Sequence, residues 1–210
     1  MARIHGILFQ LTLVAIQAMA KMMGGWHEIE GGGQSSVMMK ALTGCPNNLI
    51  KLYTKEAHGG WVCMQVGDYC DGRSFAMAKN LADRGNSAEG FFNTCMEEAA
   101  AGALICCGTD TEDEDILNGL QDRHGYSLLR VAKNVAGSGL DLVQLRNPHG
   151  DGEWMGKWSD KSDTWDAYPD VKEALSPDVS DDGLFWMERA DFLAVFDAVD
   201  MCLIHLRPPQ

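Results

Sequence analysis

Residues 124–150 have the sequence HGYSLLRVAKNVAGSGLDLVQLRNPHG, and this stretch decides the fold. Residues 126–132 and 142–146 carry the β-branched and apolar side chains that are typical of strands, with turn-forming Asn, Gly and Ser between them. His124 comes immediately before the first strand, and Asn147 stands at the end of the second. If the two strands pair, both side chains reach the same cleft.

Helices and further strands surround this stretch. Residues 88–102, which are rich in Ala and Glu, are predicted to form a helix that runs into a buried strand over 103–107. Residues 188–196 are predicted to form another helix, and residues 199–206 a closing strand. Helices followed by a mostly antiparallel β region predict an α+β fold.

The composition limits the classes of partner. The chain has 210 residues, of which 46% are hydrophobic and 22% charged, as is ordinary for a globular protein. Its formal net charge of −13 disfavours nucleic acids and anionic membranes, because both attract basic surfaces, and suits cations such as calcium. No uninterrupted run of about 18 apolar residues occurs, so no membrane span is predicted.

The seven cysteines are an odd number, and they contain neither a C-x-x-C pair nor a Cys/His cluster with zinc spacing. Several lie in apolar runs such as residues 105–107. We therefore predict reduced, mostly buried thiols in a cytoplasmic protein.

Residues 1–20 permit two interpretations. An early Arg, an apolar run and the small-residue pattern Ala18-Met19-Ala20 are features of a secretory signal peptide. The same residues also suit a buried amphipathic helix over 7–23 that ends at Gly24-Gly25. We favour the helix, because the family resemblance described below extends into it.

His124 and Asn147 suggest a catalytic chemistry. An imidazole that is oriented by a side-chain amide is the general-base half of a Cys-His-Asn triad. A single His and a single Asn near strand ends are more often structural, so these two residues alone do not assign a function.

Several motifs follow one another in order along the second half of the chain. They are His124-Gly125-Tyr126-Ser127, Leu145-Arg146-Asn147-Pro148-His149-Gly150, Glu153-Trp154-Met155-Gly156-Lys157-Trp158-Ser159-Asp160, Trp165, Asp182-Gly183-Leu184-Phe185-Trp186-Met187 and Asp191-Phe192. In order and spacing they resemble the calpain family of cysteine proteases. Residues 18–26 and Thr43-Gly44-Cys45 are similar to the end of the first calpain subdomain.

The resemblance implies a papain-like cysteine proteinase core. Residues 1–44 would be a helical remnant of the first subdomain, and residues 45–208 a second, mostly antiparallel β subdomain with flanking helices. The implied activity is calcium-dependent endopeptidase action on protein substrates, with His124 as general base and Asn147 as its orienter. Transglutaminases carry out a related acyl transfer, but that family has Asp where Asn147 stands.

The family's nucleophilic Cys lies in a G-x-C-W context far upstream of the His motif. None of the seven cysteines of this chain is followed by Trp. The sequence around Cys70 is the most similar to the G-x-C-W context, but Cys70 lies in the wrong subdomain. We therefore expect an incomplete site that needs a missing N-terminal protease half and that does not cleave peptides alone. The alternative is a catalytically inactive, calpain-like module that binds calcium or a protein partner.

By the same resemblance, Glu153, Asp160 and Asp182 would bind calcium. Leu184 stands where the family has a further acidic ligand, and the loss of an oxygen ligand weakens a calcium site. The alternative interpretation is a solvated acidic rim. Residues 109–115 (TDTEDED) are likewise expected to form a solvated acidic loop.

The chain departs from the family pattern at two further positions. His149 replaces a Trp that shields the His–Asn hydrogen bond in the family, and we expect this smaller, polar ring to protect less. Arg123 stands where the family prefers Gly before the catalytic His, and a cationic side chain there would crowd or recharge the cleft. Core packing is expected for the tryptophans in this half of the chain, which are Trp154, Trp158, Trp165 and Trp186.

Overall fold

The computed structural model describes the second half of the chain almost continuously. The described residues are 88–109, 113–150, 152–196 and 198–204, together with 21, 39, 42, 43, 45, 47–51, 54, 55, 60, 61, 64 and 65. Apart from residue 21, the predicted helix over residues 7–23 lies outside the described residues, as do most of the predicted helical remnant and Cys70.

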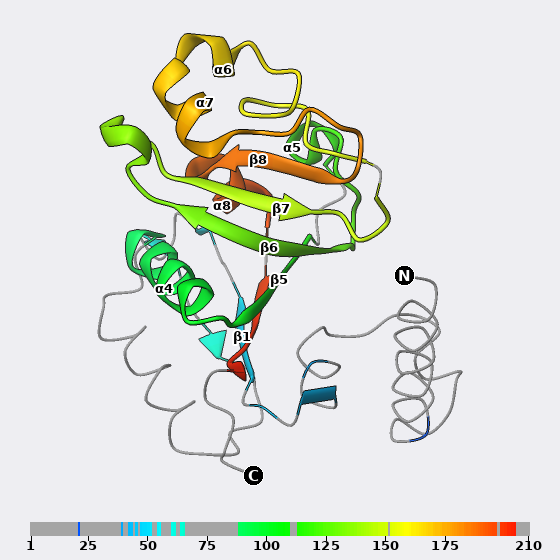
Figure 1. Cartoon of the computed structure of the whole chain (residues 1–210). Helices are drawn as coiled ribbons and strands as arrows, with labels where there is room; N and C mark the ends of the chain where they lie inside the picture. Colours follow the sequence, from blue (N-terminus) through cyan, green and yellow to red (C-terminus); the bar gives the residue numbers. More distant parts are fainter. Residues whose placement is uncertain are drawn as a thin grey trace, which may run out of the picture.

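A seven-stranded sheet with the order β4-β1-β9-β5-β6-β7-β8 forms the centre of the structure, and each of its pairings is antiparallel. Its strands are β1 (Asn47–Lys51), β4 (Met64–Gln65), β5 (Leu104–Gly108), β6 (Gly125–Ala132), β7 (Leu142–Arg146), β8 (Leu184–Glu188) and β9 (Ala198–Cys202). A separate ribbon pairs β2 (Thr54–Lys55) with β3 (Gly60–Trp61). The sheet twists strongly, so that β5 crosses the direction of β6 and β7 in Figure 1. The predicted α+β fold with an antiparallel β region is confirmed.

The register of the β6–β7 hairpin sets the position of the site. Ser127 pairs with Arg146 and Leu128 with Leu145, and the register shifts between Leu128 and Arg130. The start of β6 therefore lies beside the end of β7. This pairing brings the residue that precedes β6 close to the residue that follows β7, as the sequence predicted.

Besides the 3₁₀ helix η3 (Val135–Gly137), five α-helices with defined bounds cover this sheet in the described part of the chain. They are α4 (Ala88–Ala100), α5 (Glu114–Leu117), α6 (Thr164–Ala167), α7 (Pro169–Leu175) and α8 (Arg189–Val195). Figure 1 shows α4 beside β6, and α6 and α7 together beyond β8. The helices predicted over 88–102 and 188–196 are confirmed, whereas the closing strand ends at Cys202 rather than at residue 206. None of the helices in the described residues has the length and apolar character that a bilayer crossing requires.

The predicted acidic loop over 109–115 is partly helical. Asp113 caps α5, because its Oδ1 accepts hydrogen bonds from the backbone N–H groups of Asp115 and Ile116 at 3.0 and 3.4 Å. Negative side chains in the first turn of a helix are favourable, because the free N–H groups there carry partial positive charge. Asp113, Glu114 and Asp115 remain exposed, as expected of a solvated acidic segment.

Two apolar clusters stabilise the described region. The larger joins Phe92 and Cys95 of α4 to Phe192 and Phe196 of the α8 segment through the inner face of the sheet. The smaller packs α7 against β7 and β8, and it contains Val135, Leu142, Trp158, Trp165, Val171, Leu175 and Trp186. All four tryptophans from 154 to 186 are buried, so their predicted role in core packing is confirmed.

Candidate active site

His124 and Asn147 lie in contact at the sheet end where β6 begins and β7 ends. The His124 Nε2 and Asn147 Oδ1 atoms are 2.8 Å apart, which is a hydrogen-bonding distance. Asn147 is fully buried, while His124 is half-buried. The structure therefore brings together the two residues that the sequence singled out.

Two backbone contacts fix the side-chain amide of Asn147, and a third holds its backbone. Its Nδ2 donates to the Gly152 carbonyl at 3.1 Å, and its Oδ1 accepts from the His149 N–H at 3.0 Å. The Asn147 N–H donates to the Gly183 carbonyl at 2.8 Å. The Gly152 carbonyl can only accept and the His149 N–H can only donate, which fixes which end of the amide is the nitrogen and which is the oxygen. It is therefore the amide oxygen, rather than the amide nitrogen, that faces His124.

The orientation of the amide also sets the tautomer of the imidazole. Asn147 Oδ1 is only an acceptor, so His124 Nε2 carries the proton of the neutral ring. The lone pair of that ring is then on Nδ1. A histidine arranged in this way can take up a proton at Nδ1 while Nε2 keeps its hydrogen bond.

The backbone of His124 is held by a threonine that the sequence analysis did not select. The His124 N–H donates to Thr109 Oγ1 at 3.1 Å, and the Thr109 N–H donates to the His124 carbonyl at 3.1 Å. The Thr109 hydroxyl donates to the Gln121 carbonyl at 2.8 Å. Thr109 is buried directly after β5, and a polar residue that ends an apolar strand was the available signal.

Two neighbours of His124 differ from the family pattern. The ring centre of His149 lies 4.4 Å from that of His124, with the planes tilted by 42°, and His149 is exposed. Arg123 has a left-handed backbone with φ of 47°, and its Nε lies 3.7 Å from Asp122 Oδ2. Its side chain is 67% exposed, so the cationic group is on the surface.

The described cysteines are positioned as packing residues. Cys45, Cys95, Cys107 and Cys202 are buried and Cys106 is half-buried, all with free thiols. Burial, reinforced by the nearby Cys95, Cys106 and Asp200, raises the pKa of Cys107 well above its ordinary value. Burial also raises the pKa of Cys202. Such thiols stay protonated, which is the opposite of what an attacking sulfur requires.

The three carboxylates predicted to bind calcium lie near the turn before β8. Glu153 Oε1 accepts from the N–H groups of Asp182 and Gly183 at 3.2 and 2.7 Å. Asp182 Oδ1 accepts from the Leu184 N–H at 2.9 Å, and its Oδ2 accepts from the Ser180 hydroxyl at 3.1 Å. Burial, followed by repulsion from Glu153, Asp182 and Asp178, raises the pKa of Asp160 to about 6. The three negative groups are therefore near enough to influence one another.

The chemistry of this donor set suits calcium, which prefers oxygen ligands. In the described part of the chain, however, no three His, Cys, Asp or Glu side chains converge closely enough to bind one metal ion together. Two of the carboxylates instead accept backbone hydrogen bonds. The calcium ligands thus stay a prediction.

A pocket of about 720 Å³ lies beside the carboxylates, and neither His124 nor Asn147 lines it. Glu153 and Asp160 line it, and so does Gly152, whose carbonyl accepts the Asn147 hydrogen bond. Lys157 and Lys161 also line it, so its charge is mixed. The exposed Met155 contributes an apolar patch.

Comparison with known proteins agrees with this geometry. Residues 9–203 match the model of a family described as calpain family cysteine protease. Calpain-B of Drosophila melanogaster is 30% identical over 168 residues, which are 73% of this chain and 18% of that protein. Human calpain-12 is 34% identical over 165 residues, 73% of this chain and 22% of that protein. Human calpain-8 is 38% identical over 109 residues, 49% of this chain and 15% of that protein.

The matched region thus spans about a fifth of the length of these relatives or less. The match includes the β6–β7 hairpin, the His–Asn pair and the segment that leads into β8. It also includes the predicted N-terminal helix from residue 9 onwards. The chain belongs to the calpain family of cysteine proteases and has the α+β, papain-like fold of that family's protease core.

Proposed function

We propose that this chain supplies the general-base half of a calpain-type cysteine endopeptidase centre. The observation that carries the proposal is the 2.8 Å bond from His124 Nε2 to an Asn147 amide whose orientation is fixed by the backbone. That arrangement leaves Nδ1 as the basic nitrogen. Its protonation creates an imidazolium whose Nε2–H is already paired with an acceptor.

The chemical steps follow from that nitrogen. Nδ1 takes the proton of a nucleophilic thiol, and the resulting thiolate bonds to the carbonyl carbon of the scissile peptide. The imidazolium returns the proton to the amide nitrogen as the C–N bond breaks. Water, which gives a proton to Nδ1, then hydrolyses the thioester.

We infer that the nucleophile comes from outside the seven cysteines of this chain. The high pKa values of Cys107 and Cys202 and the burial of Cys45 and Cys95 support this inference. The partner would be a Cys-bearing first protease subdomain, and the substrate an unfolded protein segment. A reducing, cytoplasmic location is consistent with buried free thiols.

The first prediction concerns proteolysis. Incubated alone with an unfolded protein, with or without calcium, the chain is expected to release no peptides, because loss of the nucleophile costs on the order of 10⁶ in rate. Adding the Cys-bearing first subdomain of a calpain relative should produce cleavage, measured by gel electrophoresis and mass spectrometry. His124→Ala should abolish that cleavage.

Two outcomes would change this assignment. Cleavage by the chain alone that is lost in His124→Ala would mean that one of its own cysteines is the nucleophile. A stable complex with the Cys-bearing subdomain that never cleaves would favour the alternative function, an inactive module. The function of such a module would be to bind calcium or a protein partner without catalysis.

We further propose that Glu153, Asp160 and Asp182 bind calcium when the complete site assembles. Burial of Asp160, followed by the crowding of negative charge around it, raises its pKa to about 6 and supports this proposal. Calcium would supply positive charge to these carboxylates and so stabilise the turn before β8. Glu153 and Asp182 would orient that turn through the hydrogen bonds that they already accept from its backbone N–H groups.

The second prediction uses the charge of Asp160. Its pKa rises from 3.8 unfolded to about 6 folded, so the unfolded chain loses the proton first as the pH rises. Below about pH 4 this group causes no loss of stability. The loss grows as the pH rises from about 4 and is complete above about pH 6. Asp160→Asn should therefore stabilise the protein at pH 7.5 and not at pH 3.5. The full shift corresponds to about 3 kcal/mol, which solvent screening of this half-exposed group reduces to about 1–2 kcal/mol.

Urea denaturation at the two pH values, with and without calcium, measures this effect. If calcium binds, it should stabilise the unsubstituted chain at pH 7.5 and stabilise Asp160→Asn much less. Asp166→Asn serves as a matched control, because that carboxylate is 78% exposed. An Asp160→Asn chain that is no more stable than this control at pH 7.5 would refute the charge-crowding argument.

A further inference from the structure

The ring of His124 and the backbone N–H of His149 share one acceptor, the side-chain oxygen of Asn147. Asn147 Oδ1 accepts from His124 Nε2 at 2.8 Å and from the His149 backbone N–H at 3.0 Å. The two imidazole centres lie 4.4 Å apart, with planes tilted by 42°. The proposed mechanism uses the side chains of His124 and Asn147, but none of its steps needs the ring of His149.

The hydrogen bond to Asn147 prepares His124 to bind a metal ion. Histidine ligands usually donate the second ring N–H to a neighbouring oxygen, which fixes the tautomer and makes the free nitrogen more basic. His124 already has this arrangement, because Nε2–H faces the buried amide and the lone pair is on Nδ1. The metal would meet a ligand whose orientation needs no further ordering.

The separation of the rings matches a chelate. Two imidazole nitrogens that bind one ion at about 2.0–2.1 Å, with bonds roughly at right angles, place their ring centres about 4.5 Å apart. The observed separation is 4.4 Å, and the tilt keeps the rings from stacking face to face. His149 is exposed, so a metal ion from solution can reach its ring.

We propose that His124 and His149 form a binding site for a divalent transition-metal ion of the Ni²⁺, Cu²⁺ or Zn²⁺ class. Imidazole suits these ions, whereas calcium prefers oxygen ligands. The described residues contribute no third His, Cys, Asp or Glu to a common cluster, so water completes the coordination. A metal on His124 Nδ1 occupies the lone pair that takes the proton in catalysis, so the bound ion blocks the general base. The site exists whether or not the chain takes part in proteolysis.

Ni²⁺ is the suitable probe. Its tetragonal coordination offers adjacent positions at about a right angle, and it competes less than Zn²⁺ for the seven cysteine thiols. Calorimetric titration in excess calcium, which fills any carboxylate site, should give one Ni²⁺ per chain. His149→Phe keeps an aromatic ring but has no nitrogen. It should weaken binding at least about tenfold, the effect that loss of even an outer-sphere partner has on metal affinity.

Further variants separate this site from other histidines. His124→Phe should weaken Ni²⁺ binding as much as His149→Phe does, whereas His205→Phe should leave it unchanged. Circular dichroism checks that each variant is folded. In a ¹H–¹⁵N spectrum, paramagnetic Ni²⁺ should broaden the ring signals of His124 and His149 first. Absence of binding, unchanged affinity in His149→Phe, or broadening centred elsewhere would each overturn the proposal.

Discussion

Gly183→Ala is expected to lower the free energy of unfolding by about 2–5 kcal/mol. Gly183 has φ of +84°, a left-handed conformation that costs a residue with a side chain roughly 1–2 kcal/mol. A Cβ placed there would lie 2.7 Å from the Asn147 carbonyl oxygen and 3.0 Å from the Gly150 Cα. Both are backbone atoms that cannot rotate away, so overpacking adds about 1–3 kcal/mol.

This substitution should also disturb the hydrogen-bonded pair of His124 and Asn147. The Gly183 carbonyl accepts the Asn147 N–H at 2.8 Å, and its N–H donates to Glu153 Oε1 at 2.7 Å. A turn that moves to relieve the clash therefore shifts Asn147 and Glu153 together. Urea denaturation measures the loss of stability. The ¹H–¹⁵N signal of the His124 side chain reports whether the hydrogen bond to Asn147 changes.

Gly102→Ala is the matched control for this prediction. Gly102 also has a left-handed backbone, with φ of +90°, but no atom lies within 4 Å of the position of an added Cβ. It should therefore show the conformational cost alone, roughly 1–2 kcal/mol. Equal losses in the two variants would contradict the role assigned to the contact between Gly183 and Asn147.

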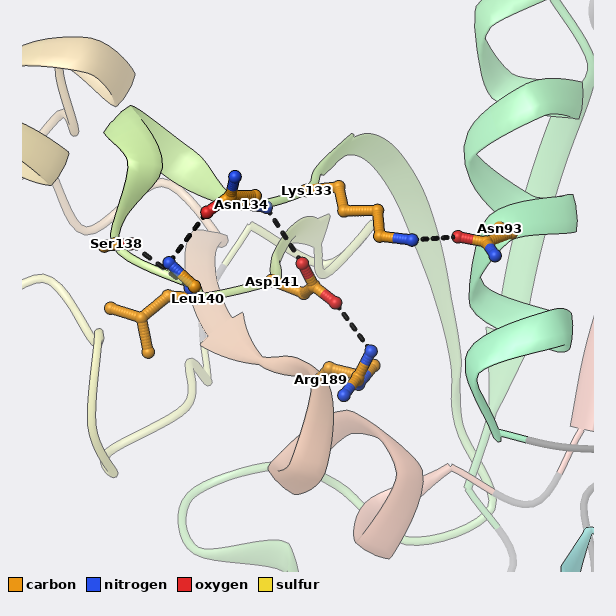
Figure 2. A network of polar contacts seen from close by, with 8 residues as sticks. Asn93, Lys133, Asn134, Ser138, Leu140, Asp141 and Arg189 are labelled. Atoms are coloured by element: carbon orange, nitrogen blue, oxygen red, sulfur yellow. Dashed lines mark hydrogen bonds and ion pairs between the residues drawn. The ribbon is translucent and has the colours of Figure 1, made fainter.

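Asp141→Ala is expected to cost about 2–4 kcal/mol. Asp141 is 8% exposed and connects the tip of the β6–β7 hairpin to the start of α8, as Figure 2 shows. Its Oδ1 accepts from the Asn134 N–H at 2.9 Å, and its Oδ2 accepts from Arg189 Nη1 at 2.6 Å. Removal of one member of a buried pair leaves the other charge poorly solvated, which costs about 3–5 kcal/mol for full burial. The Arg189 side chain is 36% exposed, so water recovers part of that cost.

The same substitution should loosen the hairpin tip. Asn134 has φ of 46° and is held there by Asp141, while its own Oδ1 accepts from the Gly139 N–H at 2.8 Å. Lys133, which precedes Asn134, donates to Asn93 of α4 at 2.7 Å (Figure 2). The hairpin tip is therefore bonded to both α4 and α8. Faster amide exchange at the tip, measured together with urea denaturation, would accompany the loss of stability.

A double-mutant cycle with Arg189→Ala separates the ion pair from the backbone contacts. Asp166→Ala is the control, because Asp166 and Lys172 also form a pair at 2.8 Å but with side chains 78% and 49% exposed. Such a surface pair should contribute less than about 1 kcal/mol. If Asp141→Ala costs no more than Asp166→Ala, burial does not strengthen the Asp141 network.

The elements that the sequence failed to predict are short or lack periodicity. Helices α6 and α7 contain four and seven residues, too few for an apolar repeat, although Pro169 at the first turn of α7 was a usable signal. Strand β8 has three consecutive buried residues, Phe185, Trp186 and Met187, rather than an alternating pattern. It pairs along its length with β7 and packs on both faces, which removes the alternation that marks a half-exposed strand.

The sequence by itself determined the two strands of residues 124–150, the His and Asn at their ends and the family that these motifs indicate. Local patterns were enough for this, because runs of β-branched and apolar residues, turn residues and the order of motifs are properties of the chain. Only the tertiary structure decided which atom of Asn147 faces His124, since that depends on the carbonyl of Gly152 and the N–H of His149. The tertiary structure alone also decided that the Glu153 and Asp182 carboxylates accept hydrogen bonds from backbone N–H groups, and that the two imidazole centres lie 4.4 Å apart. Sequence gives residue types and spacing, whereas hydrogen-bond direction and electrostatic coupling arise only when separate segments pack together.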